Sequence, residues 1–344
     1  MIDATSSLTL EEIGRLAGVS RSTVSRVLND HPNVRAEVRH RVGAVIAETG
    51  FVRNQAARAL ASKRTGLVGL VMPTGVDELF GDPYYSALVR GIQAGCERRS
   101  SILSIFPVDP DPGATEELVD AIARSVVDGV VVTAGRRSDA LIASLRDRGR
   151  NVVVVGHPVD DRDVRRVDVD NAAGSAAAVQ HLVDTGRRRI AFVGPQDPEL
   201  YAIERLEGYR SVLERSGLGI DDRLIVQAAP SRAGAAQTVA RLLEHRIDAV
   251  HAATDALASA VIAELGRGGR VVPDDVAVVG FDGFDNGDDA VVRLSTVVQP
   301  VEAVGSAAVR LLLDDDANDV GALRRVVMPT ELRIGASSAP SAGS

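Results

Sequence analysis

Short apolar runs alternate with helical segments along most of this 344-residue chain. Two of the runs, VVVV at 152–155 and VAVVG at 276–280, are almost continuously apolar. Such runs are typical of strands buried on both faces, as in parallel sheets whose faces are covered by helices. The pattern predicts an α/β architecture with right-handed crossovers and enough units for two sheets.

The predicted elements of this region are given by residue range. Strands are expected at Leu67–Val71, Ile102–Phe106, Gly129–Val132, Val152–Val155, Ile190–Val193, Ala249–Ala252 and Val276–Gly280. Helices are expected at Tyr84–Arg98, Thr115–Ser125, Ser138–Arg148, Asn171–Thr185, Ala202–Ser216, Ala233–Glu244, Asp255–Arg267 and Val301–Leu313.

Charge is divided unevenly along the chain. Residues 1–64 hold ten Lys and Arg against six Asp and Glu, which is a net charge of +4. The whole chain carries −8, so the other 280 residues carry −12. A small basic head on an acidic body favours a head that contacts a polyanion, and chance clustering of charge is the alternative.

The head has the capping and turn residues of a helix-turn-helix. Thr9 and Glu12 form a capping-box pattern before a helix at 10–17, and Gly18 supplies the left-handed residue of a tight turn. Ser20 is expected to cap a second helix at 21–28, and a third spans 36–49 before Gly50. Helical spacing predicts the inward-facing residues Ile13, Leu16, Ala17, Val24, Val27, Leu28, Val38, Val42, Val45 and Ile46.

The outward face of the second helix carries Arg21, Ser22, Ser25 and Arg26. A helix held at its N-terminus by a tight turn can enter a major groove end-on, where Arg forks onto guanine. A solvated helix surface is the alternative on this pattern alone.

Residues 8–62, and above all AGVSRSTVSRVLN, resemble the DNA-binding head of the lactose/galactose-repressor (LacI/GalR) family of bacterial transcription regulators. The resemblance implies that Arg21, Ser22 and Arg26 read bases. It also implies phosphate-contacting or capping roles for Thr9, Ser20, Thr23, Ser25 and Asn29.

Residues 54–62 resemble the hinge helix of the same family, with Asn54, Ala57 and Leu60 as the hinge positions. Nine residues are too few to hold a helix alone in water, so we expect this one to order on docking. Leu60 matches a leucine that wedges into a minor-groove step, and a plain core leucine is the alternative. Arg53 stands where the family usually has proline.

The resemblance continues over residues 66–334 to the sugar-binding core that the family shares with periplasmic binding proteins. Its landmarks are VDVDNAAG, HLVDTGRRRIAFVGP, RLEGYR, VPDDVAVVGFD and LSTVVQP. The expected fold class is thus α/β: a small all-α helix-turn-helix head plus a two-lobed, periplasmic-binding-protein-like core of parallel sheets.

The expected boundaries are a head at 1–53, a hinge and linker at 54–65, a core at 66–335 and a disordered tail at 336–344. Within the core, the first lobe is expected at about 66–167 plus 298–321, and the second at about 168–297 plus 322–335. Chain crossings between the lobes are placed near 165–170, 296–300 and 321–324.

Ligands of open α/β sheets bind at the carboxyl ends of strands. The resemblance assigns effector binding to Asp82, Tyr84, Tyr85, His157, Arg205, Thr254, Asp255 and Asp282. Alternatives remain for three of them: a surface histidine at 157, a helix-surface arginine at 205 and a helix-capping role for Asp255.

No catalytic pattern is found, so we expect neither an enzyme, nor a cofactor, nor a metal site. Cys96 is the only cysteine, and no phosphate-binding loop or nucleophile elbow appears. The absence of a membrane-spanning run and of a secretion signal predicts a cytoplasmic location.

The expected function is that of a ligand-responsive, sequence-specific DNA-binding transcriptional regulator, a repressor of carbohydrate catabolism genes. We expect it to bind a pseudo-palindromic operator as a homodimer, with a small-molecule effector, expected to be a sugar, that modulates affinity. The alternatives are a regulator with another effector, such as a nucleobase or a phosphorylated co-regulator protein, or a sugar-binding transport protein.

Overall fold

The structure is a computed structural model, and its contacts divide the chain into two units, residues 1–65 and 66–344. It describes residues 8–28, 31, 33–51, 65–72, 81–108, 112–135, 138–158, 164–196, 200–228, 232–284, 292–314 and 325–339. No helix among these residues is both long and apolar enough to cross a membrane.

The head contains the three predicted helices, α1 (Leu10–Ala17), α2 (Arg21–Leu28) and α3 (Ala36–Thr49). The capping box is confirmed: Thr9 N–H donates to Glu12 Oε2 at 2.7 Å, and Glu12 N–H donates to Thr9 Oγ1 at 3.3 Å. Gly18 and Gly50 end α1 and α3 in left-handed backbone conformation, with φ of 64° and 63°. Local sequence signals therefore explain where α1 begins and where α1 and α3 end.

The core of the head is centred on Ile13, Ala17, Val24, Val27 and Val42, which are all buried. The other predicted apolar positions of α2 and α3 lie at its margin and are partly buried.

The prediction that Leu16 faces inward is wrong, because its side chain is 54% exposed. Ile13 and Ala17 define the buried stripe of α1, and Leu16 is rotated by about 60° from Ile13, beyond the reach of the other two helices.

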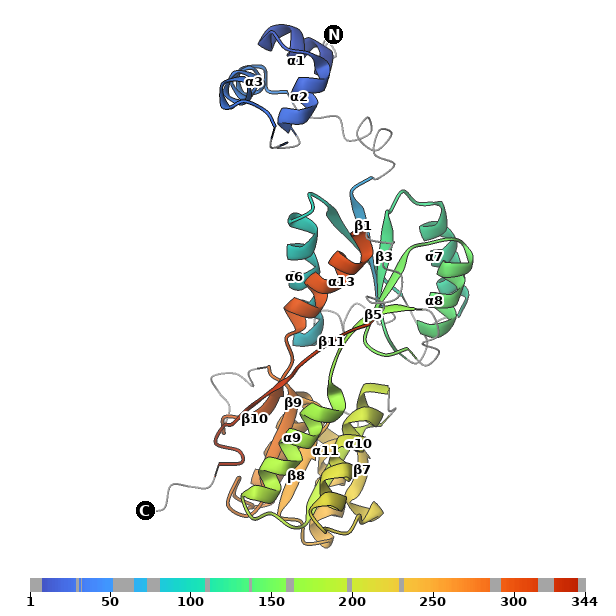
Figure 1. Ribbon diagram of the computed structural model, residues 1–344. Helices are drawn as coiled ribbons and strands as arrows, with labels where there is room; N and C mark the ends of the chain where they lie inside the picture. The colour runs from blue at the N-terminus through green and yellow to red at the C-terminus, as the bar shows by residue number, and fades with distance from the viewer. Residues whose placement is uncertain are drawn as a thin grey trace. The chain divides into compact units, whose positions relative to one another are not determined.

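The first lobe of the body is built on a sheet with the strand order β11-β5-β4-β3-β1-β2, in which all pairs are parallel (Figure 1). Its strands are β1 (Leu67–Met72), β2 (Ile102–Pro107), β3 (Gly129–Thr133), β4 (Val152–Val155), β5 (Arg165–Val169) and β11 (Arg325–Met328). Helices α6 (Pro83–Glu97) and α13 (Val301–Leu313) cover one face, and α7 (Pro112–Arg124) and α8 (Ser138–Asp147) cover the other.

The second lobe has a sheet with the order β12-β10-β9-β8-β6-β7, in which only the β10–β12 pair is antiparallel. Its strands are β6 (Ile190–Pro195), β7 (Ile225–Ala228), β8 (Ala249–Ala252), β9 (Ala277–Asp282), β10 (Ser295–Val298) and β12 (Glu331–Arg333). Its helices are α9 (Asn171–Asp184), α10 (Leu200–Arg215), α11 (Arg232–Glu244) and α12 (Asp255–Arg267), with a short 3-10 turn, η1 (Asp222–Leu224).

Every strand and helix predicted for the body is present, with ends displaced by up to three residues. The sequence analysis missed β5, β7, β10, β11 and β12. These strands are short, and β5 begins with two arginines and contains a buried aspartate, so none presents a long apolar run. Pairing with a neighbouring strand determines them, and pairing is not a local property.

The chain passes between the lobes after β5, after β10 and after β11. The first two passages, at residue 170 and at 299–300, lie within the predicted ranges. The third prediction, at 321–324, is wrong, because β11 pairs with β5 in the first sheet and the chain leaves that sheet only after Met328. The first lobe therefore extends to residues 169 and 328, beyond the predicted limits of 167 and 321.

The predicted disorder of the tail is wrong for residues 336–339. Ser337 and Ser338 are buried, and the Ser337 hydroxyl donates to Val278 O at 2.6 Å while it accepts from Ser295 N at 2.8 Å. Small hydroxyl residues fit against β9 and β10 and satisfy their backbone groups there. Residues 340–344 lie outside the described part.

Helices α6 and α13 pack backbone to backbone in the first lobe. A methyl group on Gly91 would collide with the carbonyl oxygen of Glu302, and one on Gly305 would lie 2.7 Å from Leu88 O. Glycine is required here for close approach, whereas a methyl group on Gly266 in α12 would meet no atom within 4 Å.

We expect Gly91→Ala to lower the free energy of unfolding by about 1–3 kcal/mol, because the helices must separate to admit the methyl group. Gly266→Ala is the matched control and should raise it by up to about 1 kcal/mol through helix propensity. Urea unfolding at one protein concentration measures both changes. Equal effects of the two substitutions would contradict the close packing of α6 and α13.

Candidate nucleic-acid interface and ligand site

Arg21, Ser22 and Arg26 are exposed on α2, on the side opposite the buried Val24 and Val27. The residues predicted to read bases therefore share the accessible face of this helix. Exposed Arg side chains in this position can form paired hydrogen bonds with a guanine edge.

Hydroxyl groups organise the N-terminus of α2. Ser20 Oγ accepts from Thr23 N at 3.2 Å, which confirms the predicted cap, and lies 2.8 Å from both Ser22 Oγ and Thr23 Oγ1. The hydroxyls of Ser20, Ser22 and Thr23 thus form one hydrogen-bonded group, and Ser25 lies half-buried on the next turn.

Thr9 caps α1 with its own hydroxyl. The remaining predicted DNA-contacting and hinge residues, Asn29, Asn54, Ala57 and Leu60, lie outside the described residues, as does Arg53.

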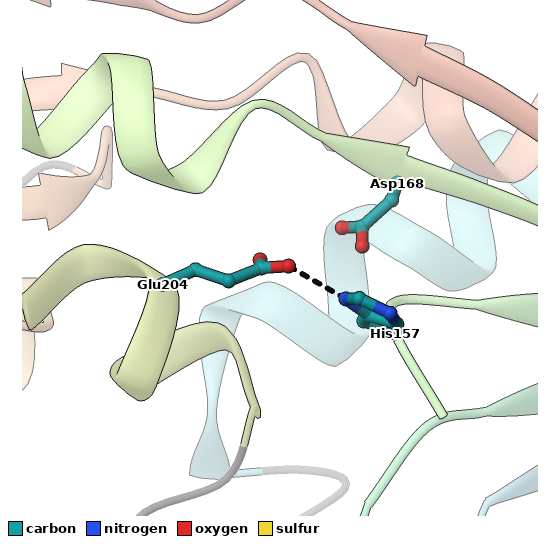
Figure 2. A group of neighbouring side chains, drawn as sticks. All are labelled: His157, Asp168 and Glu204. Atoms are coloured by element: carbon teal, nitrogen blue, oxygen red, sulfur yellow. Dashed lines mark hydrogen bonds and ion pairs between the residues drawn. The ribbon is translucent and has the colours of Figure 1, made fainter. Parts of the chain in front are cut away.

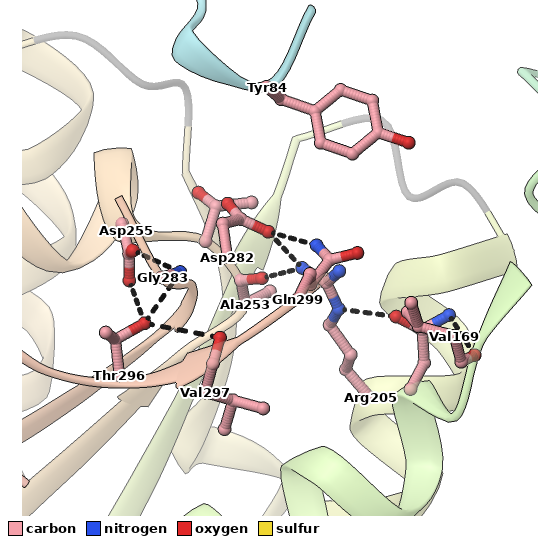
Figure 3. A network of polar contacts seen from close by, with 12 residues as sticks. Tyr84, Val169, Arg205, Ala253, Asp255, Asp282, Gly283, Thr296, Val297 and Gln299 are labelled. Carbon is pink, nitrogen blue, oxygen red and sulfur yellow. Dashed lines mark hydrogen bonds and ion pairs between the residues drawn. The ribbon is translucent and has the colours of Figure 1, made fainter. Parts of the chain in front are cut away.

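In the body, Arg205 on α10 is the centre of a buried polar network (Figure 3). Its side chain is buried, and it donates from Nε to Asn171 Oδ1 at 3.0 Å and from NH1 to Ala253 O and to Asp282 Oδ1, the last at 3.2 Å. The guanidinium also lies 3.6 Å from the centre of the Phe281 ring. The alternative of a helix-surface arginine is therefore wrong.

Asp282 ends β9 and faces Arg205. Its Oδ1 also accepts from Gln299 Nε2 at 2.8 Å, and its backbone φ is 128°, a strained value for a residue with a side chain. Burial raises the pKa of this carboxyl to about 6, against the opposing effect of the Arg205 charge. Close to neutral pH it is a carboxylate with acceptor capacity for ligand hydroxyls.

Asp255 holds the loop that follows Asp282. Its Oδ2 accepts from the backbone N–H groups of Gly283 and Phe284, both at 2.8 Å, and its Oδ1 accepts from Thr296 Oγ1 at 2.6 Å. Burial, followed by the charge of Asp282, raises its pKa to about 7.

The cap of α12 is Thr254, whose hydroxyl accepts from Leu257 N at 3.2 Å, so the alternative of Asp255 as the cap is wrong. Both side chains are engaged inside the protein, and the geometry makes Asp255 a positioning residue for the Asp282 loop.

Asp82, Tyr84 and Tyr85 lie at the start of α6 in the first lobe. Asp82 caps this helix by accepting from Tyr84 N at 2.9 Å. The two tyrosine rings meet edge to face with centres 5.5 Å apart. Burial and the charges of Asp168 and Asp282 raise the pKa of the Tyr84 hydroxyl, which indicates that this ring lies close to acidic groups of both lobes.

His157, after β4, contacts the second lobe. Its Nδ1 lies 2.6 Å from Glu204 Oε1, and Glu204 Oε2 accepts from Asn171 Nδ2 at 2.9 Å (Figure 2). The imidazole is 26% exposed and engaged across the lobes, so the alternative of an ordinary surface histidine is wrong.

Sequence reasoning missed Asp168, Asn171, Glu204 and Gln299. The first two lie in VDVDNAAG and the last in LSTVVQP, both of which served only as family landmarks. Asp168 would have been a signal only if β5 had been predicted, because a buried acid in a sheet needs a partner. Glu204 had no such signal, since its helix position resembles many exposed glutamates.

The chain matches two family descriptions. Residues 9–54 match the model of bacterial regulatory proteins of the lacI family, and residues 179–338 match that of a periplasmic binding protein-like domain. The regulator CelR of Thermobifida fusca is 36% identical over 331 residues, which cover 95% of this chain and 97% of the relative. Catabolite control protein A of Priestia megaterium is 30% identical over 309 residues, which cover 89% of this chain and 92% of the relative.

Solved structures agree with this match. The CelR–cellobiose complex is 33% identical with a TM-score of 0.75, and the alignment covers 96% of this chain and all of that one. A lac repressor dimer bound to operator has the same fold, with a TM-score of 0.73 at 22% identity over 97% of this chain. Because the relatives match along nearly their whole length, this chain belongs to the lacI family of bacterial regulatory proteins.

Proposed function

We propose that this chain is a sugar-responsive, sequence-specific transcriptional repressor that binds a pseudo-palindromic operator as a homodimer. The observation that carries the proposal is the likeness to the regulator CelR, solved with cellobiose, over 96% of the chain. The exposed Arg21, Ser22 and Arg26 of α2 support it on the DNA side. Two heads are needed because one recognition helix reads only a few base pairs. The proposed place of action is the cytoplasm, where the operator is, and the proposal includes no catalytic step.

On the ligand side, the Asp282 carboxylate can accept hydrogen bonds from sugar hydroxyls and the Arg205 guanidinium can donate to them. Tyr84 offers a ring face on which a sugar can stack. Arg205 is fixed by three protein acceptors, so the donors and acceptors of this site are preorganised. The carboxylates Asp82, Asp168, Asp282 and Glu204 outnumber the guanidinium groups of Arg205 and Arg166 around it. This balance disfavours a phosphorylated or carboxylated effector and favours a neutral, hydroxyl-rich one.

We expect Arg21→Ala and Arg26→Ala each to reduce operator affinity by about 1–3 kcal/mol, because each removes donors to a base edge. The operator is first selected from a random-sequence duplex library with the wild-type protein. Anisotropy titrations at one salt concentration then compare this duplex with a random one.

Arg241→Ala, at an exposed position of α11 in the body, is the control for loss of one positive charge. It should leave the affinities for operator and random DNA unchanged. If the α2 variants keep the wild-type ratio of operator to random-DNA affinity, α2 does not read bases.

We expect Asp282→Asn to weaken effector binding at least tenfold, about 1.4 kcal/mol or more, while ligand-free operator affinity stays within about twofold. The asparagine keeps the shape but removes the charge that pairs with Arg205. Calorimetric titration with cellobiose and a panel of mono- and disaccharides measures the effect.

Asp222→Asn, exposed in η1 of the same lobe, is the matched control and should bind like the wild type. Leu60→Ala should show the opposite behaviour, with weaker operator binding and unchanged effector affinity. An unaltered effector response of Asp282→Asn would place the ligand elsewhere.

Effector affinity should fall as the pH drops below about 6, by up to about tenfold per pH unit, because the pKa of Asp282 is raised to about 6. A ligand that donates hydroxyls to the carboxylate binds the ionised form, so protonation competes with it. Affinity measured from pH 5 to pH 8 tests this.

The pKa of Asp255 is also raised, to about 7, so Asp255→Asn serves as the control. If protonation of Asp282 causes the fall in effector affinity at low pH, this variant should still show that fall. A profile that is flat in the wild type, or that is abolished by Asp255→Asn, would contradict the assignment to Asp282.

A further inference from the structure

Three potential metal ligands from three chain segments meet where the lobes face each other (Figure 2). His157 follows β4, Asp168 lies on β5, and Glu204 lies on α10 of the second lobe. One ring nitrogen and one oxygen from each carboxylate all lie within 4.8 Å of one another.

Asp168 is the most buried of the three potential ligands. The residue is only 9% exposed, and within the described part of the chain its carboxylate accepts one hydrogen bond, from Val169 N–H to Oδ1 at 2.8 Å. Among the same residues no hydrogen bond reaches Oδ2, so this oxygen can accept a ligand. Burial raises the pKa of Asp168 to about 6, and the charge of Glu204 adds to the rise, while Arg166 and His157 oppose it. A carboxylate oxygen of this kind beside a second carboxylate favours a bound cation.

We propose that His157, Asp168 and Glu204 bind a first-row divalent transition-metal ion, with Zn²⁺ as the reference ion. One imidazole and two carboxylates are ligands that such ions accept, and three protein ligands leave a further position open for water or a ligand hydroxyl. The function proposed above does not require this site, and the ion is not part of that proposal.

The geometry is close to that of a bound site. Ligand atoms at about 2.0–2.2 Å from one ion lie about 3–3.5 Å apart, so no pair within the 4.8 Å limit has to approach by more than about 1.3–1.8 Å. His157 Nδ1 and Glu204 Oε1 already lie within hydrogen-bond distance, at 2.6 Å, and a bound ion would take the place of this hydrogen bond. Both side chains are only partly buried, at 26% and 25% exposure, and can adjust by rotation.

An ion at this place links the lobes, because two ligands belong to the first lobe and one to the second. It would stabilise the arrangement in which His157 and Glu204 are in contact. The metal ion would therefore be a second ligand, besides an organic effector, whose binding changes the relative position of the lobes.

The test uses the full-length chain without a histidine tag, after treatment with chelator. Zn²⁺ is titrated by calorimetry, and Co²⁺ serves as a visible-absorption probe of coordination. We expect one ion per chain, and His157→Gln, Asp168→Asn and Glu204→Gln should each weaken binding at least about tenfold, since loss of even an outer-sphere partner costs about 10–100-fold. Asp168→Asn removes a buried charge without changing shape, so it remains folded and keeps the test valid.

Two controls separate this site from the surface. Glu207→Gln changes an exposed glutamate of the same helix, α10, and His40→Gln changes an exposed histidine of α3, and both should bind Zn²⁺ like the wild type. The proposal is overturned if the wild type binds no Zn²⁺ at millimolar concentration. It is also overturned if Asp168→Asn and Glu204→Gln retain wild-type affinity and the Co²⁺ spectrum. Cellobiose binding without metal binding would show that the group receives only ligand hydroxyls.

Discussion

The buried guanidinium of Arg205 is the interaction on which the ligand site depends. A charge at this depth is costly unless every donor finds an acceptor, and removal of one partner from a buried pair costs about 3–5 kcal/mol. Here the acceptors come from α9, from the end of β8 and from the end of β9. The same charge that could destabilise the second lobe therefore orients Asn171 and Asp282 before any ligand arrives.

The acidic groups around Arg205 show that the site is maintained at a cost in stability. Asp255 and Asp282 have pKa values raised to about 7 and about 6 by burial, and Asp282 also has a strained backbone. An acid whose pKa is higher in the folded state binds an extra proton on folding. These groups therefore make the protein less stable as the pH rises from about 4 to about 7. Such costs are common where a protein keeps charged groups ready for a ligand.

The passages between the lobes carry part of the same network. The first passage follows Asp168, and it contains Asp170, which caps α9, and leads directly to Asn171, which contacts both Arg205 and Glu204. The second contains Gln299, which donates to Asp282. A rotation of one lobe against the other must therefore alter contacts of the ligand site, and a ligand that alters these contacts must favour one rotation. This is the physical requirement for coupling between a ligand and the DNA-binding head.

Local sequence by itself determined the helices of the head and, in the described part of the body, the long apolar strands and the α-helices, because caps and hydrophobic periodicity act over a few residues. Motifs of contiguous residues also singled out Arg21, Arg205 and Asp282, through the resemblance to the family. Only the tertiary structure decided that Leu16 is exposed, that β11 belongs to the first sheet and that Ser337 and Ser338 are buried against β9 and β10. It likewise decided that His157 meets Glu204 and that Asp255 holds a loop and does not cap a helix. Each of these outcomes depends on a partner far away in the sequence, and hydrogen bonds and strand pairs of that kind leave no periodic signal in either segment.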